Sequence, residues 1–107
     1  MIEKACIYFD AFSDKDLDKL SEVYSEDVVL TDWDIHFEGK NDVLEANKNL
    51  FDSLDSINIK VTNIGQNEHN VFAEIDILIN DDLLLHVVDV LSFNSDSKIK
   101  SIRAYKR

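Results

Sequence analysis

The sequence predicts an α+β fold in which helices pack on one face of a curved, mostly antiparallel sheet. Apolar residues in the first half of the 107-residue chain recur at helical spacing. In the second half the period changes to two, and short polar turns separate four strand-like segments. Strands joined by short turns pair antiparallel. No linker, repeat or low-complexity stretch interrupts these patterns, so we expect one domain over residues 1–107.

The first two helices are predicted from apolar stripes. Residues 2–13 carry one such stripe, with Tyr8 at its edge and Cys6 on it as a buried, inert thiol. A shorter helix is expected from Leu17 to Tyr24. Its cap is expected from one of two polar residues just after the first helix, Ser13 or Asp14.

A third helix and five strands complete the predicted elements. The helix follows a turn at 39–42, and its inner face consists of Val43, Leu44, Asn47, Leu50, Phe51 and Leu54. One strand precedes this helix, at 28–33, with a short return at 34–38. The polar connections after the helix, including 65–70, separate four strands, at 57–62, 71–79, 83–93 and 99–105.

The strand at 83–93 is the central one, and it carries the most informative residue. Both of its faces are largely apolar, so we expect it to be covered on both sides. Asp89 stands within one apolar row, where a carboxylate is costly unless it is paired, hydrogen-bonded or protonated. A cross-strand partner such as Arg103, a backbone contact, or a bulge that turns Asp89 outward would satisfy it without any function.

Composition and charge exclude several functions. The chain has 22 acidic and 11 basic residues, and its net charge of −11 disfavours nucleic acid and anionic membranes as partners. No apolar run suits a membrane span or a signal peptide. A single cysteine cannot form an internal disulfide, and we expect a cytoplasmic protein. The three histidines have no ligand spacing, so no metal site is expected. We expect no cofactor.

Three side chains could meet in one cavity. Tyr8 would face the sheet from the first helix, Asp32 lies near the end of the first strand, and Asp89 lies in the central strand. A tyrosine and a neutral aspartic acid can donate hydrogen bonds to a developing oxyanion, and an ionised aspartate can move a proton between carbons. The ordinary alternatives are that Tyr8 is a core residue and that Asp32 caps a turn. Trp33 would either wall the pocket or join the core.

Several segments resemble the nuclear transport factor 2-like superfamily, which includes SnoaL-like polyketide cyclases and Δ5-3-ketosteroid isomerases. The resemblance covers nearly the whole chain. The segments that carry it are Tyr8-Phe9-Asp10-Ala11-Phe12 with Asp16-Leu17-Asp18, Glu26 to Asp32, Glu38-Gly39-Lys40, and Val87-Val88-Asp89 with the final strand. The resemblance implies a cone-shaped fold, with about three helices on a strongly curved mixed sheet. It implies that Tyr8 is the oxyanion tyrosine, Asp32 the proton-shuttling base and Asp89 the protonated donor.

The resemblance also implies a function and an assembly. A small hydrophobic carbonyl-type ligand would undergo cofactor-free, isomerase- or cyclase-like proton transfer in a pocket walled by Trp33, Phe12, Phe51, Leu85 and Val87. Two alternatives stay open: a ligand-binding domain without chemistry, and a structural dimer or partner domain. A homodimer would form through the outer sheet face, which carries His86, Val88 and Val90.

Overall fold

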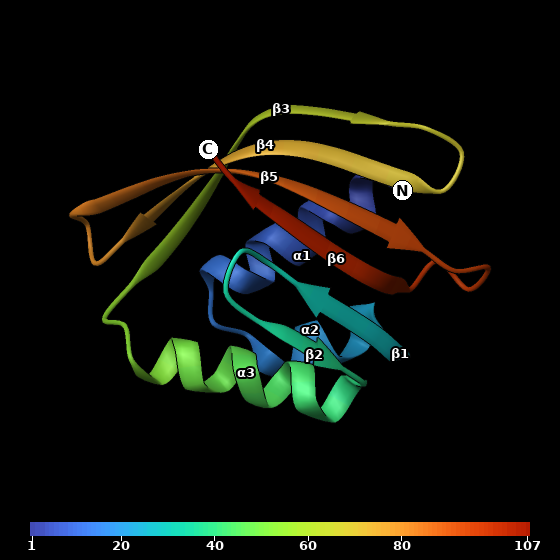
Figure 1. Cartoon of the computed structure of the whole chain (residues 1–107), viewed down its shortest axis with the longest axis horizontal. Helices are drawn as coiled ribbons and strands as arrows, with labels where there is room; N and C mark the ends of the chain where they lie inside the picture. Colours follow the sequence, from blue (N-terminus) through green and yellow to red (C-terminus); the bar gives the residue numbers. More distant parts are fainter.

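The computed structural model describes residues 1–107 as three helices and six strands (Figure 1). Their bounds are α1 Ile2–Ser13, α2 Leu17–Val23, β1 Tyr24–Thr31, β2 His36–Glu38, α3 Lys40–Asp52, β3 Ile57–Gln66, β4 Asn70–Ile79, β5 Leu83–Phe93 and β6 Ile99–Lys106. The α+β class and the four-strand meander are therefore confirmed. No helix is both long and apolar enough to cross a membrane.

The strands form one open sheet in the order β2-β1-β6-β5-β4-β3. β1 and β6 run parallel, and every other neighbouring pair is antiparallel, so the sheet is mixed as predicted. The helices lie on one side of this sheet, with α1 beneath the meander and α3 beside β1 and β2 (Figure 1).

Helix α1 buries Ala5, Tyr8 and Phe9 against the sheet. Cys6 is exposed, and the prediction of a buried thiol is wrong. α1 also buries Ala11, and at 3.6 residues per turn Cys6 lies roughly a third of a turn from the centre of the face that the four buried residues define. The apolar stripe therefore predicts the helix correctly but includes one position too many.

The cap of α2 also differs from the prediction. The side chain of Asp16 accepts the backbone N–H of Lys19 at 3.0 Å, so the cap is neither Ser13 nor Asp14. The hydroxyl of Ser13 instead accepts the backbone N–H of Ile59 in β3, at 2.9 Å. Ser13 thus joins the end of α1 to the sheet.

The first strand begins earlier and ends earlier than predicted. Tyr24 has extended backbone angles and pairs with Ile99 of β6, so α2 stops at Val23. Pairing with a strand distant in the sequence therefore prevails over the local helical pattern. At the other end, β1 stops at Thr31, and Trp33 lies in the turn to β2.

Two connections are shorter than the sequence indicates. β3 continues to Gln66 because it pairs with β4 along its whole length, which leaves residues 67–69 as the turn. The turn before α3 is reduced to Gly39, whose φ of +91° is a conformation that glycine adopts without strain.

The outer face of the sheet is uncovered in the single chain. Phe72, Leu84 and Tyr105 are 41%, 48% and 57% exposed, respectively, whereas the core lies between the inner face and the helices. No helix covers the outer face of β5, where Leu84 is exposed although Val90 and Ser92 are buried, so the expectation that β5 is covered on both sides is only partly fulfilled.

Candidate functional site

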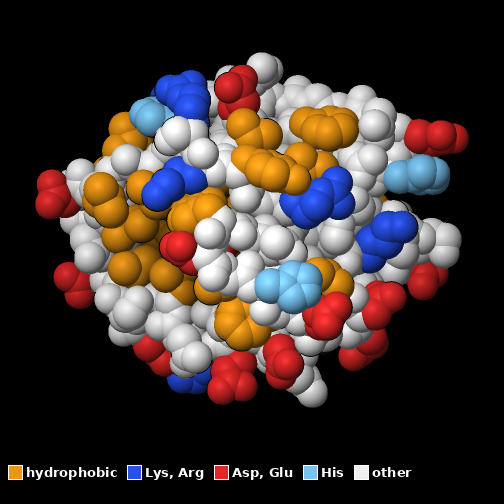
Figure 2. Space-filling model, viewed as in Figure 1, with side chains coloured by type: hydrophobic (Ala, Val, Ile, Leu, Met, Phe, Trp, Pro, Cys, Tyr) orange, Lys and Arg blue, Asp and Glu red, His pale blue; other side chains and the backbone are white.

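A cavity of about 330 Å³ lies between the inner face of the sheet and helices α1 and α3. Hydrophobic side chains make up 16 of its 20 lining residues, so the interior is apolar. The remaining lining residues are Asp32, Asp34, Asn47 and Asp89. Figure 2 shows hydrophobic side chains gathered between the β4–β5 end of the sheet and α3, on the left of the view.

The sheet register places Asp89 at the inner face and provides space around it. Asp89 pairs with Ala73 of β4 and Ala104 of β6, so both cross-strand neighbours are small. The bulge in the β5–β6 pairing follows Ser92 and does not turn Asp89 outward. Arg103 pairs with Val90, on the opposite face of the sheet, and cannot neutralise Asp89.

Asp89 is 6% exposed, and its carboxyl group has no hydrogen-bond partner in the protein, although its oxygens remain in contact with the cavity. Burial, followed by repulsion from Asp32, raises the pKa of Asp89 from its ordinary value of 3.8 to about 7. A carboxyl group with this pKa is present in both the neutral and the ionised form near neutral pH. Its neutral form can donate a hydrogen bond into the cavity.

Asp32 caps a turn and also lines the cavity. Its Oδ1 accepts the backbone N–H groups of Asp34 and Ile35, at 2.7 and 2.9 Å. These bonds fix the carboxylate at the end of β1, half-buried at the cavity wall. Asp32 therefore caps a turn, as the ordinary alternative predicts. It also lies at the cavity wall, where a catalytic base would have to lie.

Tyr8 lines the same cavity from α1 and is 5% exposed. Its ring lies 6.2 Å from the ring of Tyr24, measured between centroids. Burial raises the pKa of Tyr8 most, and the neighbouring Tyr24 and Asp89 raise it further. Tyr24 in turn donates its hydroxyl proton to Oδ1 of Asn47, at 2.7 Å.

The structure therefore brings Tyr8, Asp32 and Asp89 to one cavity. Among the predicted wall residues, Trp33, Phe12, Leu85 and Val87 line it. Phe51 does not; it is buried behind Phe12, with the two rings edge to face at 4.9 Å between centroids.

Asp34, which also lines the cavity, was not predicted from the sequence as a site residue, and neither were Asn47 and its partner Tyr24. Asn47 was assigned only to the apolar face of the third helix, and Tyr24 only to the inner face of the second. The sequence signal that could have identified Asn47 was its amide side chain, because a polar residue on an apolar helix face needs a partner when it is buried.

Residues 7–102, which are most of the chain, match a domain family described as the SnoaL-like domain. The chain belongs to the SnoaL-like family. The prediction of a nuclear transport factor 2-like relationship is thereby confirmed. No curated protein is similar enough in sequence to match this SnoaL-like chain.

Solved structures with the same fold have diverse activities in their names. A proposed SnoaL-like polyketide cyclase from Shewanella denitrificans OS-217 is 13% identical, with a TM-score of 0.88 over 98% of this chain and 88% of that one. A proposed ketosteroid isomerase from Kribbella flavida DSM 17836 is 16% identical, with a TM-score of 0.82 over 98% and 76%. An LEH-like epoxide hydrolase of M. tuberculosis is 17% identical, with a TM-score of 0.85 over 99% and 81%. At these identities the likeness establishes the fold of the SnoaL-like domain alone.

The rim of the cavity carries an aromatic residue and a cation. Trp33 is 40% exposed, and the ammonium group of Lys106 lies 5.3 Å from the centroid of its ring. This distance is within the range of a cation–π interaction. Lys106, the last residue of β6, thus lies over the indole at the opening of the cavity.

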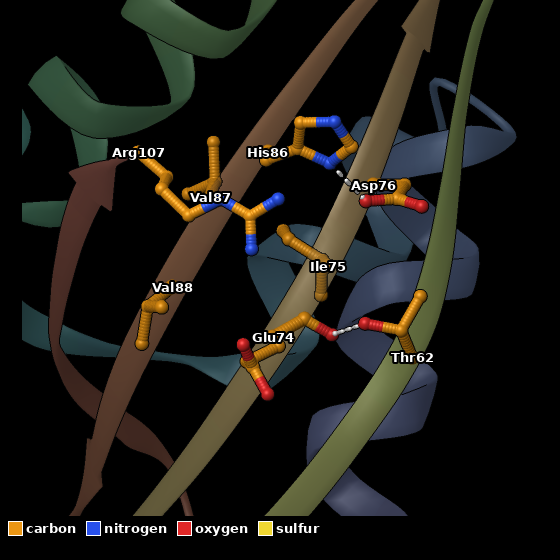
Figure 3. A pocket seen from close by; sticks show the side chains of 8 residues that line it. All are labelled: Thr62, Glu74, Ile75, Asp76, His86, Val87, Val88 and Arg107. Carbon is orange, nitrogen blue, oxygen red and sulfur yellow. Dashed lines mark hydrogen bonds and ion pairs between the residues drawn. The ribbon is translucent and has the colours of Figure 1, made fainter.

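The outer sheet face of the SnoaL-like domain carries a separate, shallow groove of about 240 Å³ (Figure 3). His86 and Asp76 point toward one another there, with 2.7 Å between Nδ1 and Oδ1. Thr62 donates to the backbone carbonyl of Glu74, at 3.1 Å. His86 is thus on the face opposite Asp89, as the alternation of the strand predicts. No three His, Cys, Asp or Glu side chains of the structure are grouped to hold a metal ion.

Proposed function

We propose that this SnoaL-like domain catalyses enolate-type proton transfer on a small, uncharged carbonyl compound. Asp32 takes a proton from the carbon beside the carbonyl and returns it to another carbon. Tyr8 and neutral Asp89 donate hydrogen bonds to the oxygen, which becomes negatively charged when the enolate forms. No cofactor enters this scheme, because both the base and the donors are side chains of the chain.

One observation carries the proposal: two carboxyl groups in the same apolar cavity have different environments. Asp89 is almost fully buried without a partner, and its pKa is raised to about 7. Asp32 is half-buried, and its Oδ1 accepts two backbone hydrogen bonds that fix the carboxyl group at the cavity wall. The two carboxyl groups thus differ in burial and in hydrogen bonding, which suits them to different roles in proton transfer.

The cavity also indicates the class of ligand. No lysine, arginine or histidine lines it, so nothing inside would neutralise a carboxylate or phosphate on the ligand. Aliphatic side chains form most of the wall, among them Ile57, Ile75, Ile77 and Leu85. An apolar molecule with one carbonyl group suits this surface best.

The experiment is hydrogen–deuterium exchange at carbons next to the carbonyl, followed by nuclear magnetic resonance in D₂O for a panel of small cyclic ketones. Wild type should exchange these hydrogens faster than buffer alone. Asp32→Asn keeps the capping oxygen but not the base, and should lose about 100-fold or more of the rate. Asp89→Asn still donates through its amide and should lose roughly tenfold. Equal losses in the two variants would contradict the assigned roles.

A binding domain without chemistry is the second candidate, favoured by the same apolar cavity. It predicts that planar phenols, which mimic an enolate, quench the fluorescence of Trp33 while no ketone exchanges deuterium. The panel should include small epoxides, since a neutral acid with an ionised base could also open an epoxide ring with water. Diol formation without deuterium exchange would replace isomerase-like transfer by hydrolysis.

We also propose that the domain forms a homodimer through the outer face of β4, β5 and β6. The apolar side chains of Phe72, Leu84 and Tyr105 support this, because they are exposed together on one face of the sheet. The helices cover only the inner face, so a second copy would cover what the chain itself does not.

A further inference from the structure

The outer face of the sheet carries charges of opposite sign on the two sides of β5. The β6 side carries Arg103 and, directly after the strand, Arg107, which are the only arginines of the chain. The β4 side carries the carboxyl groups of Glu74 and Asp76. In Figure 3, Arg107 reaches this face from the β6 side, whereas Glu74 and Asp76 rise from β4. We call Arg103 and Arg107 the basic row, and Glu74 and Asp76 the acidic row.

The two rows do not neutralise each other within one chain. Neighbouring strands lie about 4.8 Å apart, so β5 separates the backbones of the two rows by roughly 10 Å. No ion pair of the structure includes an arginine. Arg103 instead donates to the hydroxyl of Ser101, at 3.1 Å, and Asp76 contacts His86. Arginine is well suited to ion pairs with carboxylates at interfaces, so both guanidinium groups are available to a partner outside the chain.

The register of the sheet makes this face complementary to itself. Three neighbouring cross-strand lines, each read from β4 through β5 to β6, are Phe72, Val90 and Arg103; Glu74, Val88 and Tyr105; and Asp76, His86 and Arg107. The two ends of every line attract each other. They are a ring and a guanidinium group in the first line, a carboxylate and a phenol hydroxyl in the second, and a carboxylate and a guanidinium group in the third.

A two-fold axis along β5 uses this complementarity. When two sheets pack face to face in the aligned manner, their strands stay within about 30° of one another, and the axis of a symmetric dimer runs either along the strands or across them. An axis along β5 places β4 of one copy over β6 of the other, so the two ends of every line meet. An axis across the strands places β4 over β4, and the acidic row then faces a second acidic row, which is unfavourable.

We propose that a second copy of this chain docks on the outer face with its β6 over β4, so that the acidic row of each copy meets the basic row of the other. This inference rests on the proposed homodimer, and it adds the orientation of the two copies and the residues that determine it. Asp76 then lies opposite Arg107 of the partner subunit, and Phe72 lies opposite Arg103 of the partner subunit. Because a two-fold axis repeats each contact, reversing the charge of either row acts twice in the dimer.

The test reverses the two rows separately and then mixes the products. The basic-row variant is Arg103→Glu with Arg107→Glu, and the acidic-row variant is Glu74→Lys with Asp76→Lys. Sedimentation equilibrium measures the dimer dissociation constant of each variant and of their equimolar mixture, and circular dichroism checks that each variant is folded.

Matched controls carry the same changes of charge on the helix side of the domain. They are Lys4→Glu with Lys48→Glu, and Glu3→Lys with Glu45→Lys, all at exposed positions of α1 and α3. These controls, alone and mixed, measure the effect of net charge without any change to the outer face.

Each row variant alone should dimerise about 100-fold more weakly than wild type, because like charges then face each other at both contacts between rows. In the mixture, every contact between rows again joins opposite charges. A heterodimer should therefore form with a dissociation constant within about tenfold of the wild-type value. The control variants should change the dissociation constant less than about fivefold, alone or mixed, since surface charges far from the interface are screened by salt.

A second measurement needs no variant, so it decides the question even if a row variant does not fold. Isotope-filtered nuclear magnetic resonance on a dimer of labelled and unlabelled wild type should show Overhauser contacts from the Phe72 ring of one copy to the side chain of Arg103 in the other. Contacts from that ring only to β4 of the other copy would place the axis across the strands and overturn the inference.

The outcomes separate this inference from the dimer on which it rests. Row variants that dimerise as tightly as wild type, or a mixture that dimerises no more tightly than its two components, overturn the inference and leave the proposed homodimer intact. A wild type that stays monomeric removes the proposed homodimer and this inference with it.

Discussion

Replacing Asp89 with asparagine should stabilise the folded protein, and the gain should grow as the pH rises. Burial and the nearby Asp32 raise the pKa of Asp89 from 3.8 to about 7. Between these two values the folded state keeps the proton that the unfolded chain gives up. The stability of wild type therefore falls as the pH rises through this window, and the full loss is reached above pH 7.

The size of the effect follows from the shift. A change from 3.8 to about 7 corresponds to a loss of about 4 kcal/mol once Asp89 is ionised in both states. Asparagine has nearly the shape of the protonated acid and carries no charge. Relative to wild type, Asp89→Asn should therefore gain about 2 kcal/mol at pH 5.5 and about 4 kcal/mol at pH 8.5. The difference of about 2 kcal/mol between the two pH values does not depend on any constant cost of the substitution.

The assay is urea unfolding followed by circular dichroism at pH 5.5, 7 and 8.5. This range lies above the isoelectric point of about 4.4, where the protein is least soluble. Asp10→Asn, at an exposed acid of α1, is the control for the loss of one negative charge. A stability difference between Asp89→Asn and wild type that is the same at all three pH values would refute the reasoning, as would a relative gain of wild type at high pH.

Three further outcomes are expected. Asp32→Asn should lower the pKa of Asp89 yet leave it above 3.8, since burial is the larger cause; a ¹³C titration of the carboxyl group measures this, and an unchanged value would contradict the coupling. The thiol of Cys6 should react with a disulfide reagent in the native protein without unfolding, whereas protection until urea is added would mean that the helix face is wrongly assigned. Val88→Lys, on the outer face of β5, should give a monomer in sedimentation experiments while Phe72→Leu remains dimeric; a monomeric wild type would exclude the proposed dimer.

Local patterns in the sequence were sufficient for most of the fold. The stripe in α1 and the alternation in β4 and β5 are set by nearest neighbours along the chain, so they can be read without tertiary information. The predictions failed where contacts between distant segments of the chain determine the local structure. Tyr24 lies in a helical sequence pattern but pairs as a strand residue with Ile99. The hydroxyl of Ser13 accepts a hydrogen bond from Ile59 and does not cap α2.

The candidate site divides in the same way. Asp89 was identifiable because a single acid in an apolar row is anomalous wherever the strand lies. Asn47 was not, since its significance depends on Tyr24, which is 23 positions away, and on the hydrogen bond between them. The alanines that leave room for the Asp89 carboxyl are cross-strand partners, and their identity follows from register, which the sequence alone does not fix.

The parallel pairing of β1 with β6 has a consequence for the order of folding. Leu30 lies opposite Ile102, 72 positions further along the chain, while the β3–β6 meander consists of neighbours joined by short turns. Contacts between such distant segments form slowly, because a long loop must close before they contribute. Asp32 directly follows β1, so the cavity should be complete only after the meander has formed. In a refolding experiment, amide protection in β4 and β5 should therefore precede the ability to bind a phenol.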